Sequence, residues 1–250
     1  MVKLAVIADV HGNLDALEAV LADIQVEGVD QILNLGDHVS GPLDARGTAD
    51  RLMDASMLSI RGNHDRWVLA QSQDNMGPSD RVAAEQMTDA HKAWLANLPF
   101  SLSLDMGIYA CHGTPKSDEV YWLEAIDAAG TPHLADLAHI EAQAGNIDAK
   151  LLLCAHTHIP RSVQLSDGRQ VVNPGSVGCP AYDDTEPCYH IMQTGSPDAR
   201  YAIVEGKADN WAVNFKQVHY NSDRMVALAR HNQRMDWACA LETGWLRLPA

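Results

Sequence analysis

The chain has 250 residues, of which 46% are hydrophobic and 20% are charged, values typical of a folded globular protein and not of a disordered or fibrous one. Its 33 acidic residues outnumber the 18 lysines and arginines and give a formal net charge of −15. Nucleic-acid binders depend on clustered basic side chains, so this balance argues against general DNA or RNA binding. A protein with this charge that handles phosphate is expected to use bound cations.

The N-terminus and the cysteines predict the cellular compartment of the protein. The apolar run that opens the chain breaks at Asp9, which leaves it too short for the core of a signal peptide. No stretch approaches the roughly 18 apolar residues of a membrane span, so no membrane association is expected. The five cysteines are odd in number and have no CxxC spacing, as expected of reduced thiols. These features predict a cytoplasmic protein.

The first sixty residues alternate short apolar runs with segments of helical periodicity. The predicted elements are strands at 3–8, 31–36 and 57–62 and helices at 13–27 and 43–55. Asn13 is expected to cap the first helix and Gly28 to end it. Strands that alternate with helices in this way predict βαβ units and a parallel sheet.

Antiparallel strands become more frequent toward the C-terminus. After a turn at NMGPSD we predict a helix at 83–98 ended by Pro99, paired strands at 101–105 and 107–113, and a mostly helical Ala-rich segment at about 118–144. A strand at 151–156 and a hairpin at 161–175 that turns at Asp167-Gly168 follow. The last predicted elements are strands at 189–194, 199–206 and 211–220 and a helix capped by Ser222 that runs to about Asp236. No repeat or linker interrupts them, so a single domain over residues 1–250 is expected.

Apolar runs in the first half of the chain end in residues of metal-ligand type. Asp9 and His11 follow the first run, and residues at i and i+2 of an extended chain point to the same side, so both can converge on one cation. Asp37 follows the second run and Asn63 the third. Each motif alone also fits a polar turn. Together they fit a site at the carboxyl ends of parallel strands, where open α/β sheets build their binding sites.

Histidines follow the next two apolar runs. His112 ends the fourth, and the HTH motif at 156–158 follows the fifth; an HxH pair also fits solvated histidines or a mononuclear amidohydrolase. The donors are imidazoles, carboxylates and an amide without thiolate, which suits Mn²⁺, Fe, Co²⁺, Ni²⁺ or Zn²⁺. Cys111 and Cys154 neighbour these donors and are expected to be buried thiols that face the opposite side.

The order of these motifs resembles that of the calcineurin-like metallophosphoesterase superfamily, in its small bacterial phosphodiesterase-like branch. The matching segments are ADVHG at 8–12, GDHVSGP at 36–42, RGNHDR at 61–66, CHGTP at 111–115, CAHTHIP at 154–160 and NPGSVG at 173–178. The resemblance covers roughly residues 3–180. It implies an α/β fold, a four-layer α/β/β/α sandwich of the metallophosphoesterase type with two sheets packed face to face.

Residue by residue, the resemblance implies two divalent metal ions, with Mn²⁺ favoured. One ion would be held by Asp9, His11, Asp37 and His158, and the other by Asp37, Asn63, His112 and His156. Asp37 would bridge them, in keeping with a carboxylate that spans ions about 3.5–4 Å apart. A water acidified by both ions would attack phosphorus, and His64 would protonate the leaving oxygen.

A small phosphodiester is the expected substrate, and departures from the family pattern limit how narrowly it can be named. GDHVSGP lacks the Asp-Arg-Gly ending of Ser/Thr protein phosphatases, and GNHD replaces their GNHE. Ala155 replaces a usual glycine, which is tolerable if its φ is negative. Acidic residues in CPAYDD, at 179–184, replace a usual arginine and weaken any contact to a second phosphate. The alternatives are a phosphomonoesterase or nucleotide phosphatase at the same site, and a non-catalytic metal-binding interaction scaffold.

For several residues near these motifs the sequence predicts only a general role. Asp65 is expected either to orient His64 or a structural neighbour, or to cap a turn. Three neighbours stay outside the expected substrate contacts: His38, Arg61 and Arg66. The segment 74–144 is expected to roof part of the site, and three of its aromatic residues are expected in the core: Trp94, Tyr121 and Trp122. The oligomeric state is left open.

Overall fold

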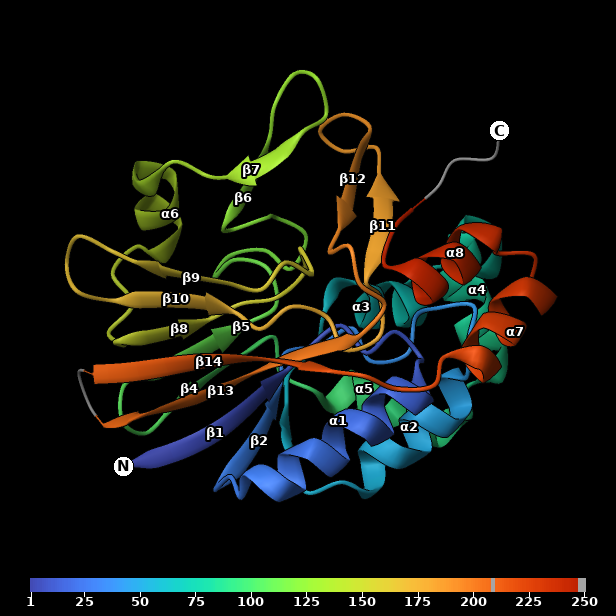
Figure 1. Ribbon diagram of the computed structural model, residues 1–250, viewed down its shortest axis with the longest axis horizontal. Helices are drawn as coiled ribbons and strands as arrows, with labels where there is room; N and C mark the ends of the chain where they lie inside the picture. Colours follow the sequence, from blue (N-terminus) through green and yellow to red (C-terminus); the bar gives the residue numbers. More distant parts are fainter. Residues whose placement is uncertain (208–209, 247–250) are drawn as a thin grey trace.

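Two five-stranded sheets lie face to face between helical layers in the computed structural model, which describes residues 1–207 and 210–246 (Figure 1). Helices α1 (Leu14–Glu27) and α2 (Ala45–Asp54) cover the outer face of the first sheet, and α6 (Leu137–Ala144) covers the second. The predicted α/β/β/α sandwich is confirmed. No helix in these described ranges is long and apolar enough to cross a membrane.

The first sheet joins the N-terminal βαβ units to the C-terminal strands. Its members are β1 (Val2–Ile7), β2 (Gln31–Asn34), β3 (Leu58–Ser59), β13 (Ala199–Lys207) and β14 (Asn210–Val218), in the order β14-β13-β1-β2-β3. Strands β1, β2 and β3 are parallel, whereas β13 and β14 add antiparallel strands beyond β1. All five strands were predicted from the sequence.

The second sheet is built from the middle of the chain. Its members are β4 (Ser101–Leu104), β5 (Ile108–Cys111), β8 (Leu151–Leu153), β9 (Arg161–Gln164) and β10 (Gln170–Asn173), in the order β4-β5-β8-β10-β9. Strands β5, β8 and β10 run parallel, so their carboxyl ends share one edge. The hairpin at Asp167-Gly168 is confirmed, with Gly168 at φ 85°.

Strand β1 is apolar from Leu4 to Ile7 because both of its faces are buried there. Leu4 and Val6 point into the core between the sheets, where they join Leu153 from β8. Ala5 and Ile7 point the other way, onto α1. A strand buried on both faces needs apolar residues at every position. Asn13 caps α1 by accepting from the Ala16 amide, and Gly28 ends it at φ 63°, both as predicted.

Two helical predictions were wrong in their boundaries. The segment 83–98 forms two helices, α4 (Pro78–Gln86) and α5 (Asp89–Asn97), because Thr88 caps the second through the His91 amide. The C-terminal segment also divides, into α7 (Asp223–His231) and α8 (Met235–Thr243), where Gln233 turns the chain at φ 58°. Ser222 makes no capping hydrogen bond.

The prediction of a mostly helical segment at 118–144 was wrong. It contains a hairpin of β6 (Glu124–Ile126) and β7 (Pro132–Leu134), and only α6 is helical. The Asp127 carboxylate accepts from the Ala129 and Thr131 amides, and Gly130 adopts φ 80°, so this turn favours strands over a helix. Trp122, which precedes β6, is buried, as expected.

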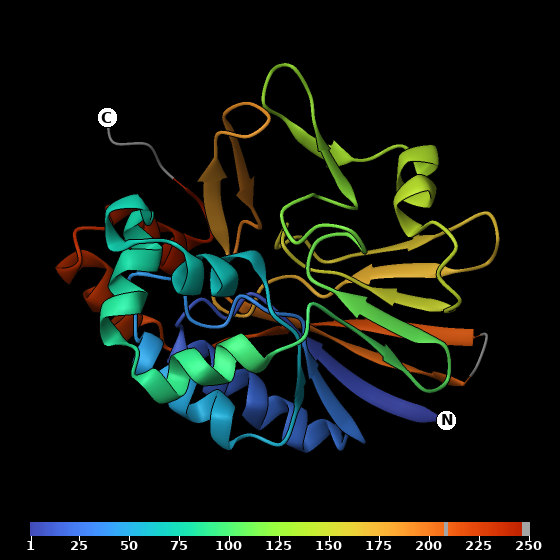
Figure 2. The same cartoon turned by 180° about the vertical axis from the view of Figure 1, so that it is seen from behind.

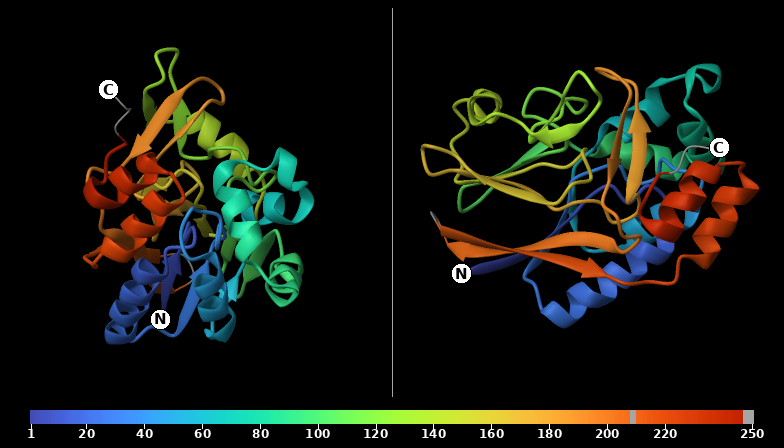
Figure 3. Two further views of the ribbon diagram at one scale, coloured as in Figure 1. Left: turned by 90° about the vertical axis from the view of Figure 1, so that its right-hand side faces the viewer. Right: turned by 45° about the horizontal axis from the view of Figure 1, so that its top comes forward.

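A second hairpin and the last two helices stand beside the carboxyl edges of the sheets. Strand β11 (Ala181–Asp184), which was not predicted, pairs with β12 (His190–Gln193). Figures 2 and 3 show α7 and α8 next to this hairpin and at the same end of the molecule as the α3–α5 group. Helix α3 (Asn63–Ala70) and the short 3-10 helix η1 (Gln73–Asn75) complete that group.

Candidate metal centre and active site

The loops that follow β1, β2, β5 and β8, together with the start of α3, meet at one edge of the sandwich. They bring two groups of side chains together, Asp9 with His11 and His158, and Asp37 with His112 and His156. Within each group the potential ligand atoms lie within 4.8 Å of one another. These are the two histidine and aspartate sets expected from the sequence.

Asp37 belongs to the second group and also approaches His11 of the first. Its Oδ2 is 3.3 Å from Nε2 of His112 and 3.9 Å from Nε2 of His11. Nε2 of His112 is also 3.9 Å from Oδ1 of Asp9. A carboxylate placed between histidines of both groups has the position that a bridging ligand requires.

The buried polar atoms of this cluster fit a bound cation. Both carboxylate oxygens of Asp9, Oδ1 of Asn63 and Nε2 of His112 are buried and make no hydrogen bond to the described residues. Native proteins leave few buried polar atoms unpaired, because each costs about 1–3 kcal/mol. Metal coordination would satisfy all four, so the residues present fit a metal centre.

The histidines are oriented by hydrogen bonds on their outer nitrogens. Nδ1 donates to a backbone carbonyl in three of them: His11 to Ser40 at 2.7 Å, His112 to Leu35 at 2.8 Å and His158 to Cys179 at 2.8 Å. His156 instead donates from Nε2 to the Glu119 carbonyl at 3.0 Å, which leaves its Nδ1 free. Metal-binding histidines show this arrangement, in which the second nitrogen fixes the tautomer.

The His11 and His158 rings face each other through nitrogens that carry no proton. Nε2 of His11 and Nε2 of His158 are 3.2 Å apart, and each ring already uses Nδ1 as its donor. Burial lowers the pKa of His11 to about 4 and that of His158 well below its usual range. Both rings are therefore neutral near pH 7. A cation between them would relieve the repulsion.

The pKa values of the two buried carboxylates, Asp9 and Asp37, are shifted in opposite directions. Burial, opposed by His112 and reinforced by the charge of Asp37, raises the pKa of Asp9. Burial acts in the same direction on Asp37 and is the largest single effect there. The charges of His112 and His64 and the hydrogen bond from His112 together outweigh burial and hold the pKa of Asp37 well below its usual range. Two buried carboxylates ionise together only when positive charge lies between them.

The backbone at the ligands is not extended, contrary to expectation. Five of the expected ligands have left-handed φ angles: Asp9 at 53°, His11 at 51°, Asp37 at 56°, His156 at 71° and His158 at 60°. Non-glycine residues rarely adopt this conformation, and such strain collects at functional sites. The side chains converge through tight left-handed turns that follow the strands. Ala155 is not among the residues with positive φ, which agrees with its tolerated methyl group.

The NPGSVG segment holds two of the ligand loops in place. Ser176 Oγ donates to the Asp9 carbonyl at 2.8 Å, and the Gly178 amide donates to the same oxygen at 3.0 Å. The Asn173 amide group donates to the Ala155 carbonyl at 2.8 Å. This segment therefore supports both the DVH and the HTH loops.

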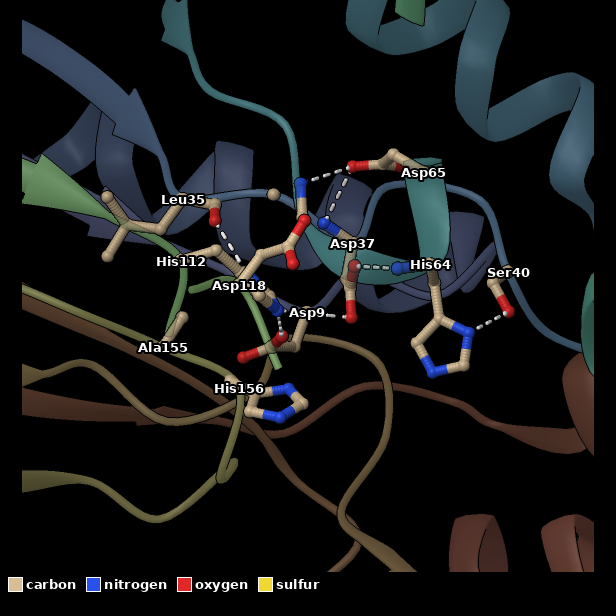
Figure 4. Close-up of polar contacts among 12 residues, drawn as sticks. Asp9, Leu35, Asp37, Ser40, His64, Asp65, His112, Asp118, Ala155 and His156 are labelled. Carbon is tan, nitrogen blue, oxygen red and sulfur yellow. Dashed lines mark hydrogen bonds and ion pairs between the residues drawn. The ribbon is translucent and has the colours of Figure 1, made fainter. Parts of the chain in front are cut away.

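Asp65 orients Asp37 and leaves the His64 ring to other partners (Figure 4). Its Oδ2 accepts from the Asp37 amide at 2.9 Å and from the Gly62 amide at 3.0 Å, and it also binds Nδ1 of His38 at 2.7 Å. Asp65 therefore fills two of its expected roles: it caps the start of α3 through the Gly62 amide and supports its structural neighbours Asp37 and His38, and it does not bind the His64 ring. His38 is fully buried and does not reach the cavity.

His64 begins α3 beside Asn63 and faces the cavity. Its amide donates to Oδ1 of Asp37 at 3.0 Å, and its side chain is 28% exposed. Burial lowers its pKa, but the charge of Asp37 and the hydrogen bond to Asp80 outweigh burial and raise it to about 9. A cation bound to Asp37 would cancel the effect of the Asp37 charge on the pKa of His64.

A cavity of 260 Å³ opens in front of the metal centre. Three of the residues around it were not among the expected site residues: Tyr182 on β11, and Arg234 and Trp237 at the start of α8. Tyr182 stacks edgewise on His158 at 4.6 Å, and Trp237 lies 6.0 Å from the His11 ring. Of the segment expected to roof the site, Ser79 lines this cavity. The C-terminal helices are therefore a larger part of the roof than predicted.

Two sheets with clustered imidazoles and carboxylates at their carboxyl edge define a metallophosphoesterase. A family model described as a calcineurin-like phosphoesterase superfamily domain matches residues 2–196, and the chain belongs to this superfamily. The resemblance inferred from the motifs is confirmed.

Relatives over the whole length agree with this assignment. The chain is 27% identical over 256 residues to an uncharacterized protein of Methanocaldococcus jannaschii, which covers 95% of this chain and 96% of the relative. A metallophosphoesterase from Sphaerobacter thermophilus has a TM-score of 0.74 at 27% identity, covering 97% of this chain and 100% of that one. A hypothetical protein from Pyrococcus horikoshii OT3 has the same fold, with a TM-score of 0.73 at 21% identity and coverage of 99% and 100%.

Proposed function

We propose that this protein is a cytoplasmic, dinuclear metal-dependent phosphodiesterase that hydrolyses small phosphodiesters. The observation that carries the proposal is the set of unpaired buried atoms on Asp9, Asn63 and His112, arranged around Asp37. Such atoms are costly in a metal-free core and become ligands when cations are present. Superfamily membership supports the same reading.

The ligand sets follow from the two groups of side chains. Asp9, His11 and His158 would hold one ion, and His112, His156 and Asn63 the other, with Asp37 shared. Neutral imidazoles with carboxylate and amide oxygens suit first-row transition metals, of which we favour Mn²⁺ over Fe, Co²⁺, Ni²⁺ and Zn²⁺.

When bound, two divalent cations supply neutralisation of the phosphoryl oxygens and acidification of the attacking water. The chain supplies the remaining functions. Asp65 fixes the backbone of Asp37, and the outer hydrogen bonds of the histidines fix their rings. His64 stands at the cavity wall, where its imidazole would give a proton to the leaving oxygen.

The charges around the cavity favour a diester over a monoester dianion. Asp183 and Asp184 line its outer part, and Arg234 there is paired with Asp236 at 2.5 Å. Arg66 is engaged by Asp118, to which its Nε and Nη2 donate at 2.9 and 2.8 Å. A second negative charge on the substrate would therefore gain little from these side chains.

Parallel kinetics on a chromogenic phosphodiester and its matching monoester would test the proposal. The protein would be stripped of metal, reloaded with Mn²⁺ and assayed at one pH, with metal content measured by mass spectrometry. We expect two ions per chain and a higher kcat/KM for the diester. Asp54→Asn, an exposed carboxylate on α2, is the control variant and should leave both results unchanged.

The other outcomes point to the alternatives. A clear monoester preference would make the protein a phosphomonoesterase or nucleotide phosphatase at the same site. Two bound ions without hydrolysis of either ester would favour a non-catalytic metal-binding scaffold. Failure to bind two ions under any of these conditions would contradict the dinuclear centre itself.

A further inference from the structure

His64 is held by a carboxylate that lies outside all the metal-site motifs. Its Nδ1 is 2.8 Å from Oδ1 of Asp80, which lies in the first turn of α4. The Asp80 side chain is 5% exposed, whereas that of His64 is 28% exposed. His64 lines the cavity in front of the metal centre, whereas Asp80 does not.

The hydrogen bond is not explained by capping of α4. Gly77 is the N-cap residue of this helix, and no side-chain capping hydrogen bond is made there. Oδ1 of Asp80 is instead directed at the imidazole. An acidic residue in the first turn also interacts favourably with the helix dipole, but that effect needs neither burial nor a histidine partner.

Other candidates for orienting the ring are weaker or already engaged. Ser40 Oγ is 3.2 Å from the same Nδ1, and a hydroxyl stabilises an imidazolium less than a carboxylate does. Both carboxylate oxygens of Asp65 are used by backbone amides and by His38. Asp80 is thus the carboxylate that binds the His64 ring.

With Nδ1 occupied in this way, the opposite nitrogen of the ring is left for the substrate. A carboxylate on Nδ1 keeps the Nδ1 proton in place, fixes the ring orientation and stabilises the protonated imidazole that a general acid requires. We propose that Asp80 is a positioning residue that presents Nε2 of His64 to the leaving oxygen. This inference rests on the proposed function, in which His64 is the proton donor.

A double-mutant cycle tests the coupling between the two residues. Asp80→Asn, His64→Ala and the double variant would be compared with wild type on esters with good and poor leaving groups. Asp80→Asn should lower kcat roughly 10²-fold for an ester with a poor leaving group, because such a group depends most on proton donation. The loss should be smaller for a good leaving group. In the His64→Ala background the same change should cause no further loss, and metal content should stay at two ions.

The control is Asp89→Asn, which alters an exposed carboxylate in the first turn of α5 without a histidine partner. It should leave kcat unchanged for both leaving groups. Additive losses in the cycle, or loss of a metal ion from Asp80→Asn, would assign Asp80 a structural role and overturn the inference.

A spectroscopic measurement keeps the inference testable apart from turnover. In the Zn²⁺-loaded protein, ¹⁵N NMR of the His64 imidazole should show a protonated, hydrogen-bonded Nδ1 in wild type and in Asp89→Asn. In Asp80→Asn this signal should shift toward the other tautomer. An unchanged signal would overturn the positioning role, whereas an inactive wild type with the expected signal would contradict only the proposed function. If Asp80→Asn does not fold, Asp80→Glu, which keeps the charge and moves the carboxylate, takes its place in both measurements.

Discussion

Arg234 Nη1 donates to Ser79 Oγ at 2.7 Å and so joins the start of α8 to the start of α4. The same guanidinium binds Asp236 through Nε and Nη2, which fixes its orientation. Ser79 is adjacent to Asp80, the partner of His64. A residue beyond the matched family domain thereby supports the wall that holds the candidate acid.

Arg234→Ala should therefore weaken catalysis without emptying the metal centre. Loss of the hydrogen bond to Ser79 would loosen the first turn of α4, and we expect kcat to fall about tenfold, because small displacements near reacting groups are costly. Hydrogen exchange at residues 77–82 should increase. Arg230→Ala is the control, since Arg230 pairs with Glu242 on the solvent side of the same helices. Equal effects of both changes would show that Arg234 acts on overall stability alone.

Asp37→Asn should remove most activity by weakening both metal sites together. An amide at this position carries no negative charge between the two cations. It also has only one oxygen, whereas the carboxylate has two with which to bridge the ions. Metal content measured by mass spectrometry should fall below one ion per chain after dialysis. Two tightly retained ions with turnover equal to that of the wild type would show that Asp37 does not bridge.

His64→Ala should keep both metal ions yet lose about 10²–10⁴ in turnover, the usual contribution of a general acid. The loss should be smaller for esters with good leaving groups, which depart without a proton. His133→Ala, at an exposed histidine on β7, serves as the control. If His64→Ala instead releases a metal ion, His64 is a ligand and its assignment as the acid is wrong.

Gly62→Ala should damage the metal centre although the backbone there is ordinary. Gly62 has φ −92° and ψ −179°, which alanine adopts easily, but its Cβ would lie 2.1 Å from Oδ1 of Asp37. The bridging carboxylate would have to move, and such overpacking also costs roughly 1–3 kcal/mol. Metal affinity and melting temperature should both fall.

Gly77→Ala provides the comparison, because Gly77 is also an N-cap glycine. It has φ −58°, and its Cβ would come no closer than 3.7 Å to Asp80. Metal affinity should be unchanged in this variant. A Gly62→Ala protein that binds metal as tightly as Gly77→Ala would show that Asp37 has room to shift without leaving its position.

The ten strands of the two large sheets were predictable because their signals are local. The apolar run in β1 and the Asp167-Gly168 turn depend on residues close in sequence, and both predictions are confirmed. The segment 118–144 departs from the prediction because its alanines favour a helix, while the turn at Asp127 favours the strands β6 and β7. Composition was the weaker signal there.

The sequence by itself determined the chemical types and the order of the candidate ligands, from Asp9 to His158, because each follows an apolar run that forms a strand. The tertiary structure alone decided how they converge and what surrounds them. No local pattern reports the left-handed φ angles at the ligands or the hydrogen bond that Ser176 of NPGSVG donates to the Asp9 carbonyl. Asp80 reaches His64 from the neighbouring helix α4, and Arg234 reaches Ser79 from the distant helix α8; both contacts exist only after the helices have packed.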